Sequence, residues 1–394
     1  GLPNVGKSTF INALIGQEVL PSGDMPVTAK IYKITQSKEE DKANISLKYN
    51  DKSVHIEFNG DSVKIHNEED TPFISLMLSC LEQNKDQNFM YKVHCCLDAI
   101  NNERTGVDDL IEVSIPFGNG LLKDSNKSFV IFDTPGSNAA TNKDHFMILE
   151  EAMKDMSNGI PIYVAEYNSL DSCDNEYLYK RIKGISQVDS RFTMIVVNKA
   201  DSANIKEDNF DDETRELILK QAVPRNLYSG GIFFVSSVMG LGSKNGGDFN
   251  DDHADEFFED NERKYSDETS KRYKSLYKYN IMPEQIKKSI VEVSEQSNDK
   301  IFANSGLLAI EHEIISFSEK YSANDKCKQS DKYIDRIIDA TQEEISDITE
   351  ARELKTNELI AEMEDDKAAL IIEIEEEGAK NSELYLKAYD ENME

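Results

Sequence analysis

The first ten residues, GLPNVGKSTF, constrain the fold of this chain more than any other stretch. Gly1 to Ser8 match the pattern G-x-x-x-x-G-K-[ST], in which a glycine-rich loop wraps its backbone N–H groups around phosphates and opens into a helix. The residues STFINALIG are typical of that helix. The pattern predicts that Lys7 reaches the β- and γ-phosphates of a nucleotide and that the Ser8 hydroxyl binds Mg²⁺.

A loop of this type normally follows a strand, and the sequence begins at the loop itself without an initiator methionine. We therefore expect a fragment whose first strand is missing. Downstream, from Gly1 to about Ser237, short β-rich runs alternate with helical stretches. These runs lie at 30–35, 45–50, 53–59, 111–117, 128–133, 161–167, 192–198 and 231–237. Such interleaving predicts an α/β fold in which helices flank a mostly parallel sheet.

Two further polar segments follow strands of this pattern. VIFDTPGS (130–137) places Asp133 where it can hold Mg²⁺ through a water, and Gly136 where its N–H can contact the γ-phosphate. In IVVNKAD (195–201), Asp201 can accept two N–H bonds from the edge of guanine, a pattern that adenine lacks. Asn198 would support this loop and the Lys199 stem would pack along the base.

Each motif by itself also fits an ordinary turn beside a strand or helix. Their order along the chain is phosphate, Mg²⁺, base, and each is expected at the carboxyl end of a strand. This is where an open α/β sheet binds its ligand. The set resembles the motifs of P-loop GTPases, which implies GTP and GDP as ligands, Mg²⁺ as cofactor and GTP hydrolysis as the reaction.

The resemblance also implies roles for individual residues. VSS (235–237) matches the last base-contacting loop of the family, with the Ser237 N–H directed at the guanine carbonyl. Thr28 resembles the switch threonine that completes the Mg²⁺ coordination and holds the attacking water, a role that Thr9 and Thr35 fit less well by position. The implied nucleotide-binding set is Gly1, Asn4, Val5, Gly6, Lys7, Ser8, Thr9, Asp133, Gly136, Asn198, Lys199, Asp201, Ser236 and Ser237; the implied metal ligands are Ser8, Thr28 and Asp133.

Two GTPase subfamilies compete for this sequence. PNVGKST resembles the Era-like group, in which an asparagine in the position of Asn4 holds a catalytic potassium ion. The spacing favours dynamin-like GTPases, because Thr28 and Asp133 are 105 positions apart and enclose a β-rich insertion at about 38–127. The helix expected at 304–322, which leads into a long helical segment, is also similar to bacterial dynamin-like GTPases. We therefore identify the chain as similar to that group and truncated at both ends.

The dynamin-like resemblance implies a mechanism without a glutamine after Gly136, where Ser137 stands. A monovalent cation, K⁺ or Na⁺, at the phosphate loop would act with Asn4, Lys7 and Thr28, and the GTPase domains would form a homodimer. We expect slow basal hydrolysis that rises on self-association. The resemblance also implies membrane remodelling, with lipid contacts made by regions outside these residues, and a peripheral position at the inner face of a membrane.

The charge and composition of the chain limit the classes of partner that it can bind. The net charge of −31 and the pI near 4.6 argue against nucleic acid as a partner. Five cysteines without a CxxC pair are typical of a reduced, cytoplasmic protein. An Era-like switch acting on RNA or the ribosome stays as an alternative, although no basic module supports it. A GTPase-fold scaffold without activity is the second alternative.

The last part of the chain changes character. We expect a GTPase domain at 1–317, with an acidic surface loop at about 243–268, and an incomplete helical neck or stalk at 318–394. Apolar positions in this last segment step by four, three, four and three, which is the heptad spacing of a bundle or coiled coil. They are Ile334, Ile338, Thr341, Ile345 and Ile348, continued less regularly by Leu359, Met363, Leu370 and Ile374.

Overall fold

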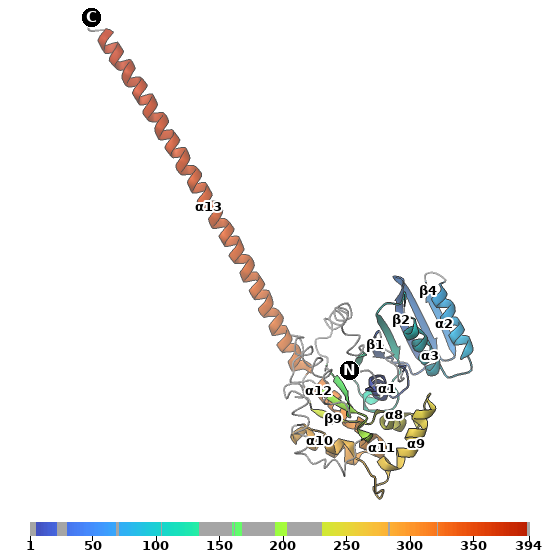
Figure 1. Cartoon of the computed structure of the whole chain (residues 1–394). Helices are drawn as coiled ribbons and strands as arrows, with labels where there is room; N and C mark the ends of the chain where they lie inside the picture. Colours follow the sequence, from blue (N-terminus) through green and yellow to red (C-terminus); the bar gives the residue numbers. More distant parts are fainter. Residues whose placement is uncertain are drawn as a thin grey trace. The chain divides into compact units, whose positions relative to one another are not determined.

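A computed structural model describes residues 5–21, 30–67, 71–103, 105–133, 160, 162–167, 194–202, 231–282, 284–320 and 322–391. Strands and helices interleave along these residues, which confirms the α/β class (Figure 1). The chain divides into two compact units, Gly1–Ala323 and Asn324–Glu394. The first holds all the described strands, and the second belongs to one long helix.

Six strands form one sheet in the order β4-β3-β2-β5-β1-β6. Strand β1 (Ile31–Gln36) lies next to the edge strand β6 (Val130–Asp133), with which it pairs antiparallel, and it pairs in parallel with β5 (Leu110–Ile115). Asp133 lies opposite Tyr32 at the end of the β6 pairing. This arrangement brings the expected Mg²⁺ ligand to the carboxyl end of a strand.

The β-rich insertion supplies the antiparallel part of this sheet. Its strands β2 (Lys42–Tyr49), β3 (Lys52–Asn59) and β4 (Ser62–Asn67) pair antiparallel in sequence. Asn50 and Asp51 connect the first two strands with positive φ angles of 48° and 64°. Two such residues form the tight turn whose twist suits a β-hairpin.

A three-stranded sheet carries the base-binding motifs. Its strands β7 (Ile162–Glu166), β8 (Met194–Asn198) and β9 (Ile232–Phe234) are all parallel. β8 is buried along its whole length, as the apolar run MIVV predicts for a strand covered on both faces. The expectation of a mostly parallel sheet describes these three strands, whereas the six-stranded sheet is mixed because of its hairpins and β6.

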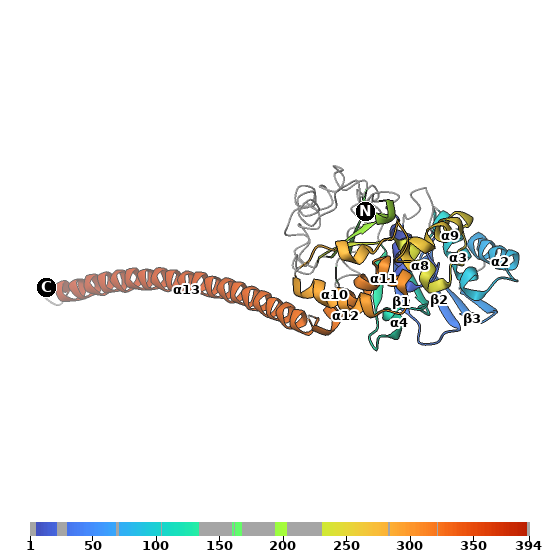
Figure 2. The ribbon, with the colours of Figure 1, turned by 90° about the horizontal axis from the view of Figure 1, so that it is seen from below.

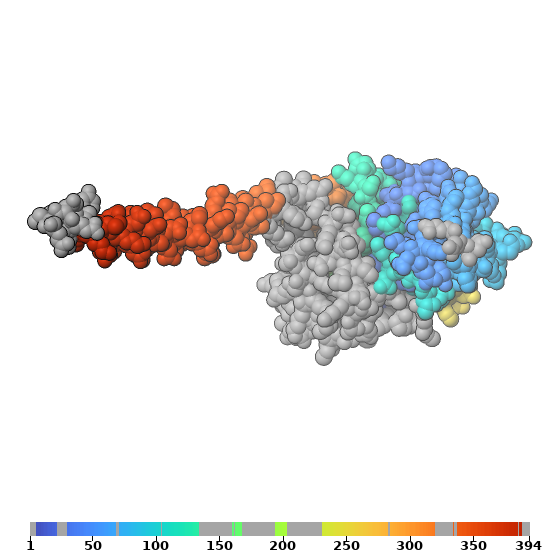
Figure 3. All heavy atoms as spheres, turned by 90° about the horizontal axis from the view of Figure 1, so that it is seen from above, coloured from blue at the N-terminus to red at the C-terminus, as the bar shows by residue number. Residues whose placement is uncertain are grey.

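The insertion also contains two helices that the sequence analysis missed, α2 (Pro72–Gln83) and α3 (Phe89–Asn102). Side chains that precede them cap their first turns: the Thr71 hydroxyl accepts from the Ile74 N–H at 3.4 Å, and the Asn88 amide oxygen accepts from the Tyr91 N–H at 2.8 Å. In the space-filling view the insertion, blue to teal, occupies one part of the face shown (Figure 3).

The expectation of an acidic surface loop at about 243–268 is wrong. α8 (Ser237–Asn245) enters this segment, and α9 (Asp252–Ser266) occupies most of it. The Asp251 carboxylate caps α9, acidic residues follow in its first turn, and Arg263 and Lys264 lie in its last turn, so the charges complement the helix dipole. Phe258 and Tyr265, seven positions apart, are buried on one face. The sequence did not indicate this helix because its two buried apolar residues are spaced widely among many charged ones.

The remaining helices complete the first unit. Helix α8 lies beside α9 and α11 (Figure 2) and also contacts α1, so the helix after the phosphate loop packs against the later part of the chain. The remaining helices of this unit are α1 (Lys7–Ile15), α4 (Leu121–Asp124), α10 (Glu284–Gln296), α11 (Lys300–Asn304) and α12 (Leu307–Lys320). Short 3-10 turns lie at η3 (Ala200–Ser202) and η5 (Leu276–Tyr279).

The long helical segment is confirmed as α13 (Ser322–Glu391), which has 70 residues. The isoleucines of the expected heptad spacing, Ile334, Ile338, Ile345 and Ile348, are 47–58% exposed. Their packing against further helices or another chain stays a prediction. No helix in the described part of the chain is long and apolar enough to cross a membrane.

Candidate functional site

The phosphate loop joins α1 at a residue that has to be glycine. Gly6 adopts a left-handed conformation with φ 71°, and a Cβ atom there would lie 2.6 Å from the amide nitrogen of Asn198. The Phe10 N–H donates to the Gly6 carbonyl at 2.9 Å and closes the first turn of α1. Lys7 and Ser8 therefore begin the helix directly beneath the loop.

Asn198 connects three of the sequence motifs. It is buried at the end of β8, and its amide nitrogen donates to the carbonyls of Val5 at 3.0 Å and Gly6 at 3.2 Å. Its amide oxygen accepts from the Ser237 N–H at 3.2 Å and from the Ser237 hydroxyl at 2.7 Å. Residues 193 and 39 positions away in the sequence thus meet at one side chain. The sequence predicted that Asn198 supports the base loop, whereas its side chain holds the phosphate loop and the turn after β9.

This network corrects one expected role. The Ser237 N–H was assigned to the guanine carbonyl, but it donates to Asn198 instead. Ser236, also buried, donates its N–H to the Ser305 carbonyl at 3.0 Å. Both serines accordingly hold the turn after β9 in place. The role predicted for the Ser237 N–H is wrong because this group, at the start of α8, already donates to an acceptor within the protein.

The isosteric change Asn198→Asp is expected to lower the free energy of unfolding by about 2–3 kcal/mol, because it removes the donor to the buried carbonyl of Val5 and the partly buried carbonyl of Gly6. Asn88→Asp is the matched control: Asn88 uses only its oxygen, at the N-cap of α3, where an acid is well tolerated. Urea unfolding of the two variants measures the difference. Equal midpoints would show that the Asn198 amide group adds nothing to the stability of the loop.

Lys7 of the phosphate motif and Asp133 of the predicted Mg²⁺ motif lie together. The Lys7 ammonium is 2.7 Å from the Asp133 carboxylate, which is fully buried at the end of β6. Burial, with the charge of Asp133 as a second cause, raises the pKa of Tyr32. A buried carboxylate and the neighbouring Ser8 hydroxyl are the hard oxygen donors that Mg²⁺ takes beside nucleotide phosphates. These residues fit an Mg²⁺ site completed by a ligand.

The base loop is stabilised by contacts that the sequence analysis did not include. Lys199 has φ 55°, and the Ser202 N–H and hydroxyl donate to its carbonyl at 3.2 and 2.7 Å. The Lys199 ammonium lies 3.3 Å from the Glu166 carboxylate at the end of β7. Lys274, from the segment after α9, donates to the Asp201 carbonyl. Burial lowers the pKa of Lys274, and the charge of Asp201 opposes that shift.

Glu166 could have been found from the sequence as another acid that ends a strand, whereas no local signal marks Lys274.

Some of the predicted site residues cannot be placed in this geometry. Gly1, Asn4, Thr28 and Gly136 lie outside the described residues, so their roles stay predictions. Thr9 lies in α1. Thr35 lies in β1, where its hydroxyl donates to the Val113 carbonyl at 3.3 Å.

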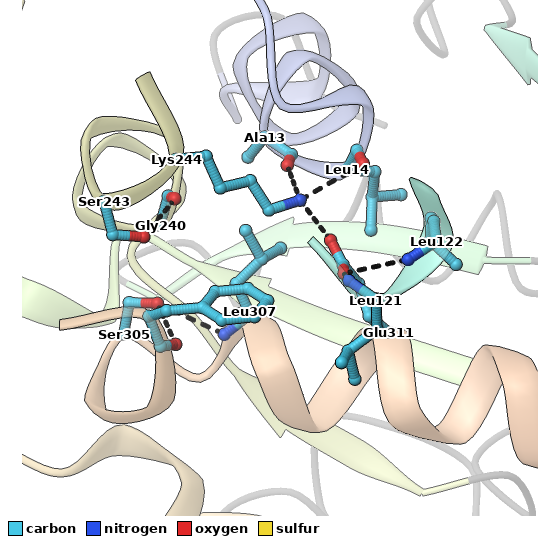
Figure 4. Close-up of polar contacts among 11 residues, drawn as sticks. Ala13, Leu14, Leu121, Leu122, Gly240, Ser243, Lys244, Ser305, Leu307 and Glu311 are labelled. Carbon is cyan, nitrogen blue, oxygen red and sulfur yellow. Dashed lines mark hydrogen bonds and ion pairs between the residues drawn. The ribbon is translucent and has the colours of Figure 1, made fainter. Parts of the chain in front are cut away.

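A buried ion pair between α8 and α12 also contacts α1 and α4 (Figure 4). The Lys244 ammonium pairs with the Glu311 carboxylate and donates to the carbonyls of Ala13 at 2.7 Å and Leu14 at 3.3 Å, near the end of α1. The second Glu311 oxygen accepts from the first two N–H groups of α4 at 2.8 and 3.4 Å. Burial lowers the pKa of Lys244 and raises that of Glu311, and the opposite charge of each partner resists these shifts.

Comparisons with known proteins identify a family to which this sequence is similar. A family model described as Dynamin family matches residues 1–200. Two solved structures, each described as an oligomerised bacterial dynamin pair that provides a mechanism for long-range sensing and tethering of membranes, share 16% identity with the chain at TM-scores of 0.36 and 0.34. Each alignment covers 91% of this chain and 47% of the solved one, so the chain spans about half their length. No curated protein matches.

Proposed function

The chain belongs to the dynamin family of GTPases, and on that basis we propose that it binds GTP and GDP and hydrolyses GTP with Mg²⁺ as cofactor. The observation that carries the proposal is Asn198, which links the phosphate loop at Val5 and Gly6 to the turn that ends in Ser237. A buried side chain with four hydrogen bonds of this kind holds the phosphate and base motifs in one rigid arrangement.

The roles of the charged residues follow from their positions. The Lys7 ammonium, which lies beside the Asp133 carboxylate, would bind the β- and γ-phosphates of a nucleotide, and Asp133 and Ser8 would hold Mg²⁺. Bound Mg²⁺ would neutralise charge on the phosphate oxygens. N–H groups at the start of α1 favour the same anion. We further propose that Thr28 holds the attacking water and that Asn4 holds a monovalent cation, K⁺ or Na⁺, at the phosphate loop.

The proposed base specificity predicts the effect of Asp201→Asn. An asparagine can accept only one of the two N–H bonds from guanine and presents a donor to the other, so GTP affinity should fall by about 10- to 100-fold. Xanthine carries a carbonyl at that position, and xanthosine triphosphate should bind the variant more tightly than GTP does. Calorimetric titration with both nucleotides and ATP measures this, with Asp61→Asn, on the β3–β4 turn, as control.

An unchanged preference for GTP in Asp201→Asn would remove Asp201 from the base site. Tight binding of ATP by the native chain would contradict guanine recognition altogether. No nucleotide binding at all would favour the alternative of a GTPase-fold scaffold. The match to the dynamin family model argues against the Era-like alternative.

We also propose that hydrolysis depends on self-association through the GTPase domains, assigned to 1–317, which would precede the helical neck or stalk at 318–394. Ser137 stands where a water-positioning glutamine would be, and in this proposal a monovalent cation and a second copy together take over its role. Phosphate release per molecule should rise severalfold with protein concentration and with K⁺. A flat rate over a hundredfold range of concentration would contradict this dependence.

Membrane remodelling is proposed from family membership alone, with a cytoplasmic, peripheral location at the inner face of a membrane. The net charge of −31 supports the further proposal that nucleic acid is not a partner.

A further inference from the structure

The segment that follows α9, residues 267–275, reaches the base loop from a part of the chain that lies outside all the predicted motifs. Its Lys274 is half-buried, and the Lys274 ammonium donates to the backbone carbonyl of Asp201, 73 positions earlier. Asp201 is the residue to which the recognition of guanine is assigned. The main chain of this residue is therefore held by a side chain that the motif itself does not supply.

The segment is fixed on both sides of Lys274. The Asn304 amide nitrogen donates to the Tyr273 hydroxyl at 2.9 Å, and the Ser275 hydroxyl donates to the Asn304 amide oxygen at 2.7 Å. The Lys274 N–H donates to the Lys264 carbonyl, near the end of α9, at 2.8 Å. Asn304 is buried in α11, so both neighbours of Lys274 are bonded to the packed interior of the first unit. The lysine side chain thus starts from a firmly held stretch of backbone.

The turn that carries Asp201 is short, and backbone bonds hold it on either side of this residue. The Ala200 N–H donates to the carbonyl of the residue after β9 at 3.1 Å, and the Ser202 N–H donates to the Lys199 carbonyl at 3.2 Å. The bond from Lys274 fixes the Asp201 carbonyl between them. Together these contacts restrict rotation of the Asp201 main chain, and that rotation sets the direction in which the carboxylate points.

We propose that Lys274 is a positioning residue of the base site and a determinant of its guanine specificity. This inference rests on the proposed function, in which the Asp201 carboxylate accepts two N–H bonds from the edge of guanine. Two parallel hydrogen bonds require the carboxylate to lie along that edge, so a small rotation of Asp201 weakens the pair. A contact that fixes the main chain keeps the carboxylate aligned before the base arrives, so binding does not have to order the loop.

Lys274→Met keeps most of the stem and removes the donor, and it should lower the affinity for GTP about 3- to 10-fold, the cost of ordering a loop that was already fixed. Inosine triphosphate offers only one of the two N–H groups, so its affinity should fall less and the preference for GTP over it should narrow. Lys274→Arg, which restores a donor, should recover part of this preference. Calorimetric titration with both nucleotides measures the two affinities.

Lys278→Met is the matched control for this test. Lys278 is exposed four positions further along the chain, with its ammonium 5.8 Å from the centre of the Tyr277 ring, and its loss should leave both affinities unchanged. An unchanged preference for GTP over inosine triphosphate in Lys274→Met would overturn the inference.

A second background locates the effect at the carboxylate. In Asp201→Ala the carbonyl that Lys274 contacts remains, but the carboxylate is absent. Lys274→Met should therefore cause no further loss of GTP affinity in this background. A loss as large as in the native background would show that Lys274 acts on the nucleotide by another route, and it would reject the positioning role.

Hydrogen exchange without nucleotide separates positioning from a general loss of stability. In Lys274→Met the amides of residues 200–202 should exchange severalfold faster, while those of β1 and β5 exchange as in Lys278→Met. Faster exchange throughout the first unit would contradict a local role. If the native chain prefers GTP and Lys274→Met keeps that preference, this inference alone fails. If the native chain binds neither nucleotide, the proposed function fails and the specificity role of Lys274 fails with it.

Discussion

Lys244→Met is expected to lower the free energy of unfolding by about 3–5 kcal/mol, because it leaves the Glu311 carboxylate buried without its counter-charge. The carbonyls of Ala13 and Leu14 would lose their donor in the same variant. Both side chains of the pair are at most 2% exposed, so water cannot replace the missing partner. Urea unfolding followed by tyrosine fluorescence measures the loss, since the chain has 16 tyrosines and no tryptophan.

Two variants make this experiment specific. Lys33→Met breaks an ion pair with Glu112 whose members are 37% and 52% exposed, and it should cost less than about 1 kcal/mol. The double change Lys244→Met/Glu311→Leu removes both charges and should cost less than the sum of the single changes. If Lys244→Met were no more destabilising than Lys33→Met, the buried pair would not hold these four elements together.

Lys7→Met is expected to lower the rate of GTP hydrolysis by about 10²–10³-fold, because the ammonium would no longer neutralise the charge that develops on the phosphates. The structure places this ammonium at the start of α1 and already beside a carboxylate, so its loss also affects the unliganded protein. Phosphate release under single-turnover conditions measures the chemical step.

Lys7→Arg separates charge from position in this test. Arginine keeps the positive charge beside Asp133 and so should preserve stability, but its wider planar group should not restore the full rate. Lys33→Met, on β1 and paired with Glu112, serves as the activity control and should retain native hydrolysis. Native rates in Lys7→Met would remove Lys7 from the phosphate site and with it the mechanism proposed for this chain.

Local patterns were sufficient to predict the elements of the first unit. Each of the eight expected β-rich runs contains a strand, because alternating or continuous apolar runs bounded by turn residues depend on neighbours in the sequence; β4 (Ser62–Asn67) was not among those runs. The helix after the phosphate loop and the long α13 were found for the same reason. The helices of the insertion, α2 and α3, were missed, although Thr71-Pro72 and Asn88 are capping signals at their first turns.

The sequence alone determined the α/β class, the order of the motifs and the residues at strand ends, since these depend on local propensity and spacing. Only the tertiary structure showed that β6 runs antiparallel to β1, that Asn198 bonds to residues 193 and 39 positions away, and that Lys244 and Glu311 are buried together. Such contacts join segments distant in the chain. A lysine and a glutamate 67 positions apart carry no local sign that they will meet, because their burial depends on how α1, α4, α8 and α12 pack.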